Sequence, residues 1–108
     1  MLPRERRLRT AEVADIMRRG SFARGRYITA KVLPTPAGGT IRAAAVVSKK
    51  VARNSVERNR VRRALYNAVS SLSVHRPLNI VFIVNAMPTE QPERAFTVDV
   101  SNIVSTIK

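Results

Sequence analysis

A nearly continuous apolar run, LNIVFIVN at residues 78–85, constrains the fold of this chain more than any other segment. Its length suits a β-strand, and nearly continuous apolar content is typical of a strand that is buried on at least one face. Pro77, directly before the run, ends the preceding connection. With 108 residues, 44% of them hydrophobic, the chain is long enough for one modest core. We therefore expect one domain over residues 1–108, built around a central strand.

The segment before this strand predicts an amphipathic helix over residues 54–72. Asn54 is a suitable N-cap, and Glu57 three residues later resembles a capping box. Apolar residues then recur at helical spacing: Val61, Ala64, Leu65, Ala68, Val69 and Leu72. The broadly opposite side carries Asn59, Arg62, Arg63 and Tyr66. One face of this helix is expected to pack and the other to bind.

The remaining segments predict a mixture of helices and strands. A first helix over residues 10–19 has Thr10 as N-cap and an apolar stripe of Val13, Ile16 and Met17. Residues 26–33 and 41–48 are typical of strands, and the loop PTPAGG between them predicts an antiparallel hairpin. A terminal helix is indicated by the spacing of Val100, Ile103, Val104 and Ile107. The expected order is α-β-β-α-β-α, a small α+β sandwich in which helices pack on one sheet.

Positive charge is concentrated in one stretch of the chain. Residues 48–63, SKKVARNSVERNRVRR, hold seven basic side chains and one Glu. The chain has 20 Lys and Arg against 7 Asp and Glu, a net charge of +13, and a polyanion normally relieves such self-repulsion. A merely solvated helix face would mix the two signs, so nucleic-acid contact is the better interpretation. Asn59 adds a neutral donor and acceptor among the arginines, which indicates a surface shaped for phosphate and sugar.

Other kinds of site have little support in the sequence. The chain contains no Cys, and His75 is its single His, so we expect no metal site of its own. Glu12 and Asp15 could suggest a metal-binding pair, but acids in the first turns of a helix are commonly stabilised by its dipole. A nuclease active by itself would need His, Glu and Lys around one phosphate, or an acidic metal site. No segment has the length of a membrane span, and we expect a soluble cytoplasmic protein whose residues 1–8 form a flexible basic arm.

The basic helix and the strand before it resemble the protein subunit of bacterial ribonuclease P. In that family a strand ending in Ser-Lys-Lys precedes a helix that reads roughly Ala-Val-x-Arg-Asn-x-x-Lys-Arg-x-x-Arg. Here the strand ends in VSKK at residues 47–50, and the helix reads SVERNRVRRALY at residues 55–66, with Tyr66 where the family usually has Arg. RL at residues 7–8 and RRG at residues 18–20 are similar too, so the resemblance covers nearly the whole chain.

This resemblance implies an accessory subunit of an endoribonuclease that removes the 5′ leader of precursor tRNA. The catalytic RNA and its Mg²⁺ would carry the chemistry, and the protein, with no catalytic residue, would neutralise charge and position the substrate. The implied partners are the catalytic RNA and precursor tRNA, with no protein partner and no membrane. The β-α-β unit around the basic helix would have the rare left-handed connection. The alternative is a structural RNA-binding protein of ribosomal type, without a role in cleavage.

Two sets of site residues follow from the charge pattern and the resemblance. The candidates for RNA binding are Lys49, Lys50, Arg53, Arg58, Asn59, Arg60, Arg62, Arg63 and Tyr66. The candidates for a cleft that receives the leader are Val13, Met17, Phe22 and Tyr27. The family usually has Phe at the positions of Val13 and Met17, and an aromatic residue on the first strand at the position of Ala30. Phe22 and Tyr27 could either stack on RNA or pack within the protein.

Overall fold

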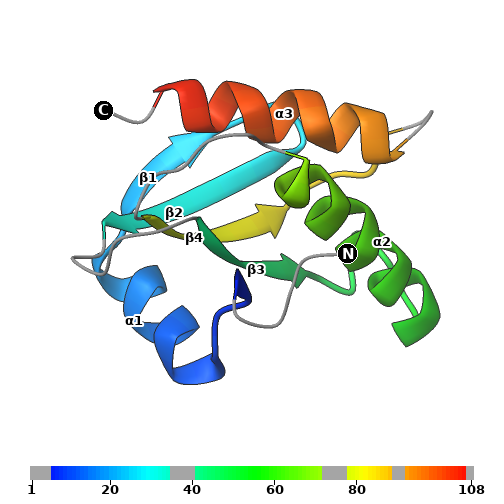
Figure 1. Cartoon of the computed structure of the whole chain (residues 1–108). Coiled ribbons are helices and arrows are strands. Elements are labelled where there is room, and N and C mark those ends of the chain that lie inside the picture. Colours follow the sequence, from blue (N-terminus) through cyan, green and yellow to red (C-terminus); the bar gives the residue numbers. More distant parts are fainter. Residues whose placement is uncertain (1–5, 35–40, 72–77, 89–91, 107–108) are drawn as a thin grey trace.

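The computed structural model describes residues 6–34, 41–71, 78–88 and 92–106, which form three helices and one four-stranded sheet (Figure 1). In chain order the elements are α1 (Thr10–Arg19), β1 (Ser21–Arg24), β2 (Ile28–Pro34), β3 (Arg42–Val47), α2 (Ser55–Ser70), β4 (Leu78–Val84) and α3 (Pro92–Thr106). The α+β arrangement is confirmed, with one strand, β1, that the sequence analysis did not predict. The order is therefore α-β-β-β-α-β-α.

Strand β4 is central, as its apolar sequence predicts. The sheet order is β1-β2-β4-β3, in which β2 is antiparallel to both of its neighbours and β3 is parallel to β4. The expected hairpin between residues 26–33 and 41–48 is therefore wrong. The long apolar run of β4 takes the place between these two strands, where partners on both edges pair its backbone, and α2 provides the crossover that parallel strands need. The left-handed sense of this crossover stays a prediction.

The main core lies between the sheet and the pair α2 and α3. From the sheet it includes Ile28, Ala30, Ile80, Phe82 and Val84, all at most 1% exposed. Helix α2 contributes Val61, Leu65, Ala68 and Val69, which confirms the predicted apolar face. Helix α3 contributes Phe96, Val100, Ile103 and Val104. Leu72, His75 and Ile107 lie outside the described residues.

Helix α1 covers the other face of the sheet (Figure 1). Ile16 packs with Ala44 and Val81 in a second, smaller cluster, bordered by Val13 and Leu33. The helix has the predicted bounds, residues 10–19, but its N-cap is Arg9 and not Thr10, which is already helical. The Arg9 backbone N–H donates to Glu12 Oε1 at 3.0 Å, so a carboxylate satisfies this helix start.

The chain just before α1 lies along the free edge of β3. Arg7 forms a parallel bridge with Ala43, the Leu8 N–H donates to the Ala43 carbonyl at 2.9 Å, and Arg6 Nε donates to the Ile41 carbonyl at 3.0 Å. These contacts protect an edge that would otherwise expose unpaired backbone groups. Arg6 to Leu8 are therefore not part of a free arm, in contrast to the expectation for residues 1–8.

Candidate nucleic-acid interface

The turn that leads into α2 places the first cations of the basic stretch on the surface. The N–H groups of Val51 and Ala52 both donate to the Ser48 carbonyl at 3.1 Å, which folds the chain back on itself. Lys49, Lys50 and Arg53 are exposed in this turn. The Asn54 side chain then accepts from the Glu57 N–H at 2.8 Å, which confirms Asn54 as the N-cap of α2.

The exposed side of α2 continues the cationic surface. Asn59, Arg60 and Arg63 are exposed, and Arg62 is half-buried. Arg62 Nη1 donates to Asn59 Oδ1 one turn earlier, so the Asn59 amide oxygen binds the Arg62 guanidinium. This contact explains why a neutral amide occurs among the arginines, and it leaves the remaining guanidinium donors available.

Two predicted RNA-binding residues have structural roles. Arg58 Nη1 donates to the carbonyls of Ala52 at 3.2 Å and Arg53 at 3.0 Å, which fastens the basic turn to the first turn of α2. Tyr66 is half-buried, and its hydroxyl oxygen accepts from the Ala45 N–H of edge strand β3 at 3.2 Å. These two side chains therefore shape the surface, while Lys49, Lys50, Arg53, Arg60, Arg62 and Arg63 supply its charge.

The cleft candidates do not all gather in one place. Val13 borders the second cluster, Met17 lies one turn further along α1 and is 38% exposed, and Phe22 on β1 is 60% exposed. By strand alternation Phe22 shares the α1 face of the sheet. Tyr27 instead packs against the main core on the α2 and α3 side, with the Arg26 guanidinium 5.4 Å from its ring centroid. Tyr27 is therefore not part of this cleft.

The strand register shows which residue of β2 lies on the α1 face of the sheet beside Phe22. Ala30 is fully buried in the main core, so this position faces α2 and α3 and not α1. Its neighbour Lys31 pairs with Phe22 across β1 and β2, and Lys31 Nζ lies 5.8 Å from the Phe22 ring centroid. The next row of the same face contains Arg24, Thr29, Ile83 and Val46. Lys31 and Arg24 were not among the predicted site residues, although the alternation of Ile28, Ala30 and Val32 with Thr29 and Lys31 could have indicated the side of the sheet on which Lys31 lies.

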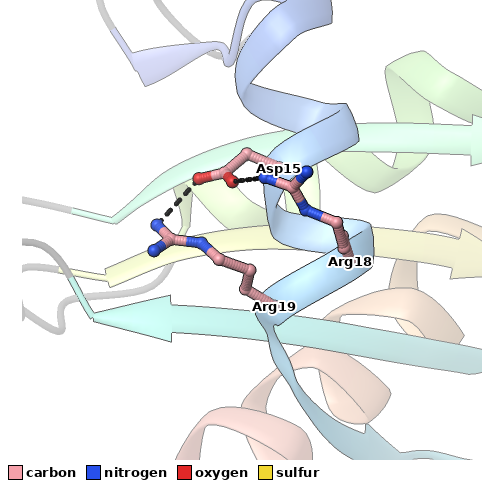
Figure 2. A network of polar contacts seen from close by, with 3 residues as sticks. All are labelled: Asp15, Arg18 and Arg19. Carbon is pink, nitrogen blue, oxygen red and sulfur yellow. Dashed lines mark hydrogen bonds and ion pairs between the residues drawn. The ribbon is translucent and has the colours of Figure 1, made fainter.

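Arginines occupy both carboxylates of the first helix. Glu12 receives hydrogen bonds from Arg42 Nη1 at 2.6 Å and Nη2 at 2.9 Å, and these bonds, with the Arg9 N–H, lower the pKa of Glu12. Asp15 binds Arg18 at 3.0 Å and Arg19 at 2.8 Å (Figure 2), and these hydrogen bonds lower its pKa in turn. Both carboxylates therefore bind arginine guanidinium groups. Among the described residues, no cluster of three His, Cys, Asp or Glu is placed to hold a metal.

A further carboxylate, Asp99 on α3, organises the turn between β1 and β2. It is 4% exposed and accepts from the backbone N–H groups of Arg26 at 2.6 Å, Tyr27 at 2.9 Å and Ile28 at 3.0 Å. The sequence offered no signal for this role, because the partners lie more than seventy residues away. This contact fixes the hairpin that carries Phe22 and Arg24.

No helix within the described part of the chain has the length and hydropathy to cross a membrane.

The sequence and the fold of this chain both match known proteins. A family model described as Ribonuclease P matches residues 2–108. A curated relative, the ribonuclease P protein component of Pseudanabaena sp. (strain PCC 6903), is 32% identical over 111 residues, covering 100% of this chain and 96% of the relative.

Solved structures agree with this sequence match at the level of the fold. The RNase P protein from Thermotoga maritima has a TM-score of 0.78 at 16% identity, covering 94% of this chain and 97% of that one. The RNase P protein of Staphylococcus aureus has a TM-score of 0.74 at 20% identity, covering 93% of each chain. The fold is thus that of the protein components of a tRNA-processing endoribonuclease. The chain belongs to the ribonuclease P protein family.

Proposed function

We propose that this chain binds the catalytic RNA of ribonuclease P through the basic turn and the exposed side of α2. The observation that carries this proposal is the one-sidedness of α2. Val61, Leu65, Ala68 and Val69 are buried, while the opposite side and the preceding turn expose cations with Glu57 as the single acid of residues 48–71. Such a surface attracts phosphates without reading sequence, and the shape of the folded RNA then selects the site.

In this proposal the open sheet face beside α1 receives the 5′ leader of precursor tRNA. Phe22 offers an exposed ring for a base, and Lys31 and Arg24 are the cations nearest to it in the strand register. A single strand is bound in this way when aromatic rings stack on bases and a positive groove follows the phosphates. The protein thereby positions the leader while the hydrolysis takes place on the RNA.

The cleavage chemistry is assigned to the RNA and its Mg²⁺. Hydrolysis of a phosphodiester needs either a metal site or acid and base groups around one phosphate. Among the described acids, Glu12 and Asp15 are bound by arginines and the buried Asp99 by backbone N–H groups, and no three His, Cys, Asp or Glu of the described residues are placed together to hold a metal. The function of this chain is therefore charge neutralisation and substrate positioning.

The test is cleavage of 5′-labelled precursor tRNA by the ribonuclease P RNA of the same organism at low Mg²⁺, with and without the protein. We expect the protein to restore cleavage at the mature 5′ end, and the protein without RNA to cleave nothing. If the protein binds the RNA tightly but leaves cleavage unchanged, the alternative of a structural RNA-binding protein replaces this proposal.

A further inference from the structure

A hollow of about 230 Å³ opens where the basic turn, the first turns of α2 and the segment after β4 meet. It is lined by Val51, Ala52, Glu57, Arg60, Val61 and Met87. Ala52 and Val61 are buried and form its base, whereas Glu57 and Arg60 are exposed and stand at its opening. The hollow thus combines an apolar base with one carboxylate and one guanidinium.

The size of the hollow limits what it can hold. Drug-sized ligands occupy sites of roughly 300 Å³ and more, so a complete nucleotide cofactor does not fit. At roughly 30 Å³ for each water molecule, the volume of about 230 Å³ equals about eight waters, which suits one flat ring system. Met87 in the lining offers a thioether that contacts aromatic rings favourably. The shape and chemistry favour a single nucleobase.

Cationic residues flank one wall of this hollow in the sequence. Val51 and Ala52 line it, and Lys49, Lys50 and Arg53, which flank these two residues in the same turn, are exposed. An RNA strand whose phosphates contact these three cations would lie beside the turn that forms one wall of the hollow. A base that is not stacked in the RNA could enter the hollow without moving the backbone away from the cations.

Charge neutralisation does not explain why the acidic residue Glu57 lies in this cationic surface. A carboxylate in this surface repels phosphates, and among the described residues the Glu57 side chain forms no ion pair and accepts no hydrogen bond. A carboxylate accepts from the N–H groups of a base, and a guanidinium donates to its oxygen and nitrogen acceptors. Guanine presents both kinds of group on adjacent positions, the N1 and N2 donors beside the O6 acceptor.

We propose that the hollow receives an unstacked guanine of the bound RNA, with Glu57 accepting from its N1–H and N2–H groups and Arg60 donating to O6. The identity of the RNA rests on the proposed function, whereas the chemistry of the hollow does not. The apolar base supplied by Val51, Ala52 and Val61 contacts the faces and edge of the ring.

The first experiment needs no RNA partner. Amide and methyl resonances of the full chain are followed by NMR during titration with guanosine 5′-monophosphate, uridine 5′-monophosphate or inorganic phosphate. We expect the guanosine nucleotide to shift Val51, Ala52 and Val61 and the Met87 methyl, and phosphate to shift only the turn cations. Equal shifts of the hollow by all three compounds, or no shift of the hollow when the phosphate shifts have saturated, would overturn the proposal.

The second experiment measures affinity for the ribonuclease P RNA of the same organism. Glu57→Gln removes a negative charge, so charge neutralisation alone predicts tighter binding. The guanine site instead predicts binding weaker by roughly five-fold or more, because the carboxylate pairing with N1 and N2 is lost. Glu93→Gln makes the same charge change at an exposed position of α3 and is expected to bind as tightly as the wild type or slightly more tightly.

A variant that fills the hollow separates shape from charge. Ala52→Leu is expected to weaken RNA binding without changing its salt dependence, because no phosphate contact is altered, whereas Val56→Leu at an exposed position outside the lining has no effect. If Ala52→Leu fails to fold, the exposed Glu57 variant carries the test. Unchanged or tighter binding of Glu57→Gln overturns the guanine site. If the wild type does not bind this RNA but the guanosine shifts persist, the proposed function fails and the hollow stands.

Discussion

The Asp99 carboxylate lies so close to Gly25 that no other residue fits at this position without movement. A Cβ on Gly25 would lie 2.5 Å from Asp99 Oδ1 and 2.7 Å from Oδ2. The carboxylate cannot retreat freely, because the N–H groups of Arg26, Tyr27 and Ile28 all donate to it. Gly25 is thus required by the close approach of α3 to the turn between β1 and β2.

Gly25→Ala is expected to lower the free energy of unfolding by about 2 kcal/mol, because the new methyl group displaces a carboxylate that satisfies three backbone donors. Chemical denaturation followed by circular dichroism measures this difference. Ser21→Ala, at an exposed position of the neighbouring strand, should change the free energy by less than about 0.5 kcal/mol. Equal stability of Gly25→Ala and the wild type would show that the turn adapts.

Asp99→Asn tests the electrostatic part of the same contact. The amide keeps one acceptor oxygen but points a nitrogen donor at backbone N–H groups, so at least one buried donor loses its partner. We expect a loss of about 2–3 kcal/mol in the free energy of unfolding. Urea titration measures it, with Glu93→Gln on the same helix as an exposed control. A loss no larger than that of the control would contradict the role assigned to Asp99.

The Glu12 and Arg42 pair predicts a pH dependence of stability. Hydrogen bonds from Arg42, and then from the Arg9 N–H, lower the pKa of Glu12 in the folded state below its ordinary value of 4.5. The pair therefore stabilises the fold above that value and loses its contribution as the pH falls through the lower folded pKa. Glu12→Gln should cost about 1 kcal/mol at neutral pH.

The check is the free energy of unfolding of wild type and Glu12→Gln across the acid range. The difference in the free energy of unfolding between the two proteins should shrink on acidification and disappear below the folded-state and unfolded-state pKa values of Glu12. Asp15→Asn, which removes an exposed partner of Arg18 and Arg19, should have a smaller effect at every pH. A difference that does not depend on pH would assign the effect of Glu12 to packing.

Variants of Arg58 and of the pair Arg62 and Arg63 should distinguish an effect on stability from an effect on RNA binding. Arg62→Ala with Arg63→Ala is expected to leave the fold intact and to weaken RNA binding. If about six phosphates are neutralised, the slope of log affinity against log salt is about −4 to −5, and the double variant should reduce its magnitude by about 1.5. Filter binding at several salt concentrations gives both values.

Arg58→Ala, unlike the double variant, should lower the free energy of unfolding by about 1 kcal/mol, because the carbonyls of Ala52 and Arg53 lose their donor. Thermal unfolding of the wild type, Arg58→Ala and the double variant of Arg62 and Arg63 provides the comparison. Loss of the fold in the Arg62 and Arg63 variant would mean that these residues stabilise the protein and that its effect on RNA is indirect.

The cleft assignment predicts an effect that depends on the leader. Phe22→Ala should weaken binding of precursor tRNA to the holoenzyme by roughly five-fold or more, since stacking on one base contributes about 1–3 kcal/mol. Lys31→Met should also weaken it and reduce its salt dependence. Mature tRNA, which lacks the leader, should bind each variant as it binds the wild type. Tyr27→Phe, on the other side of the sheet, serves as the control, and equal losses for mature and precursor tRNA would rule out this cleft.

Local sequence patterns determined most of the helices and the basic surface. The spacing of Val61, Leu65, Ala68 and Val69 decided which side of α2 is buried, and Asn54 decided where the helix begins, because both depend on residues within a few positions of each other. The same periodicity left the cations of α2 on the surface. The apolar run of β4 likewise predicted its central place in the sheet.

Pairing between distant segments was decided only by the tertiary structure. The position of β3 beside β4 instead of β2 and the contact of Asp99 with the turn after Gly25 both join residues far apart in the chain. Hydrophobic periodicity tells which residues are buried, but it does not tell which partner buries them. Arg58 and Tyr66 have structural roles for the same reason, since their carbonyl and N–H partners become available only when the turn and the edge strand are in place.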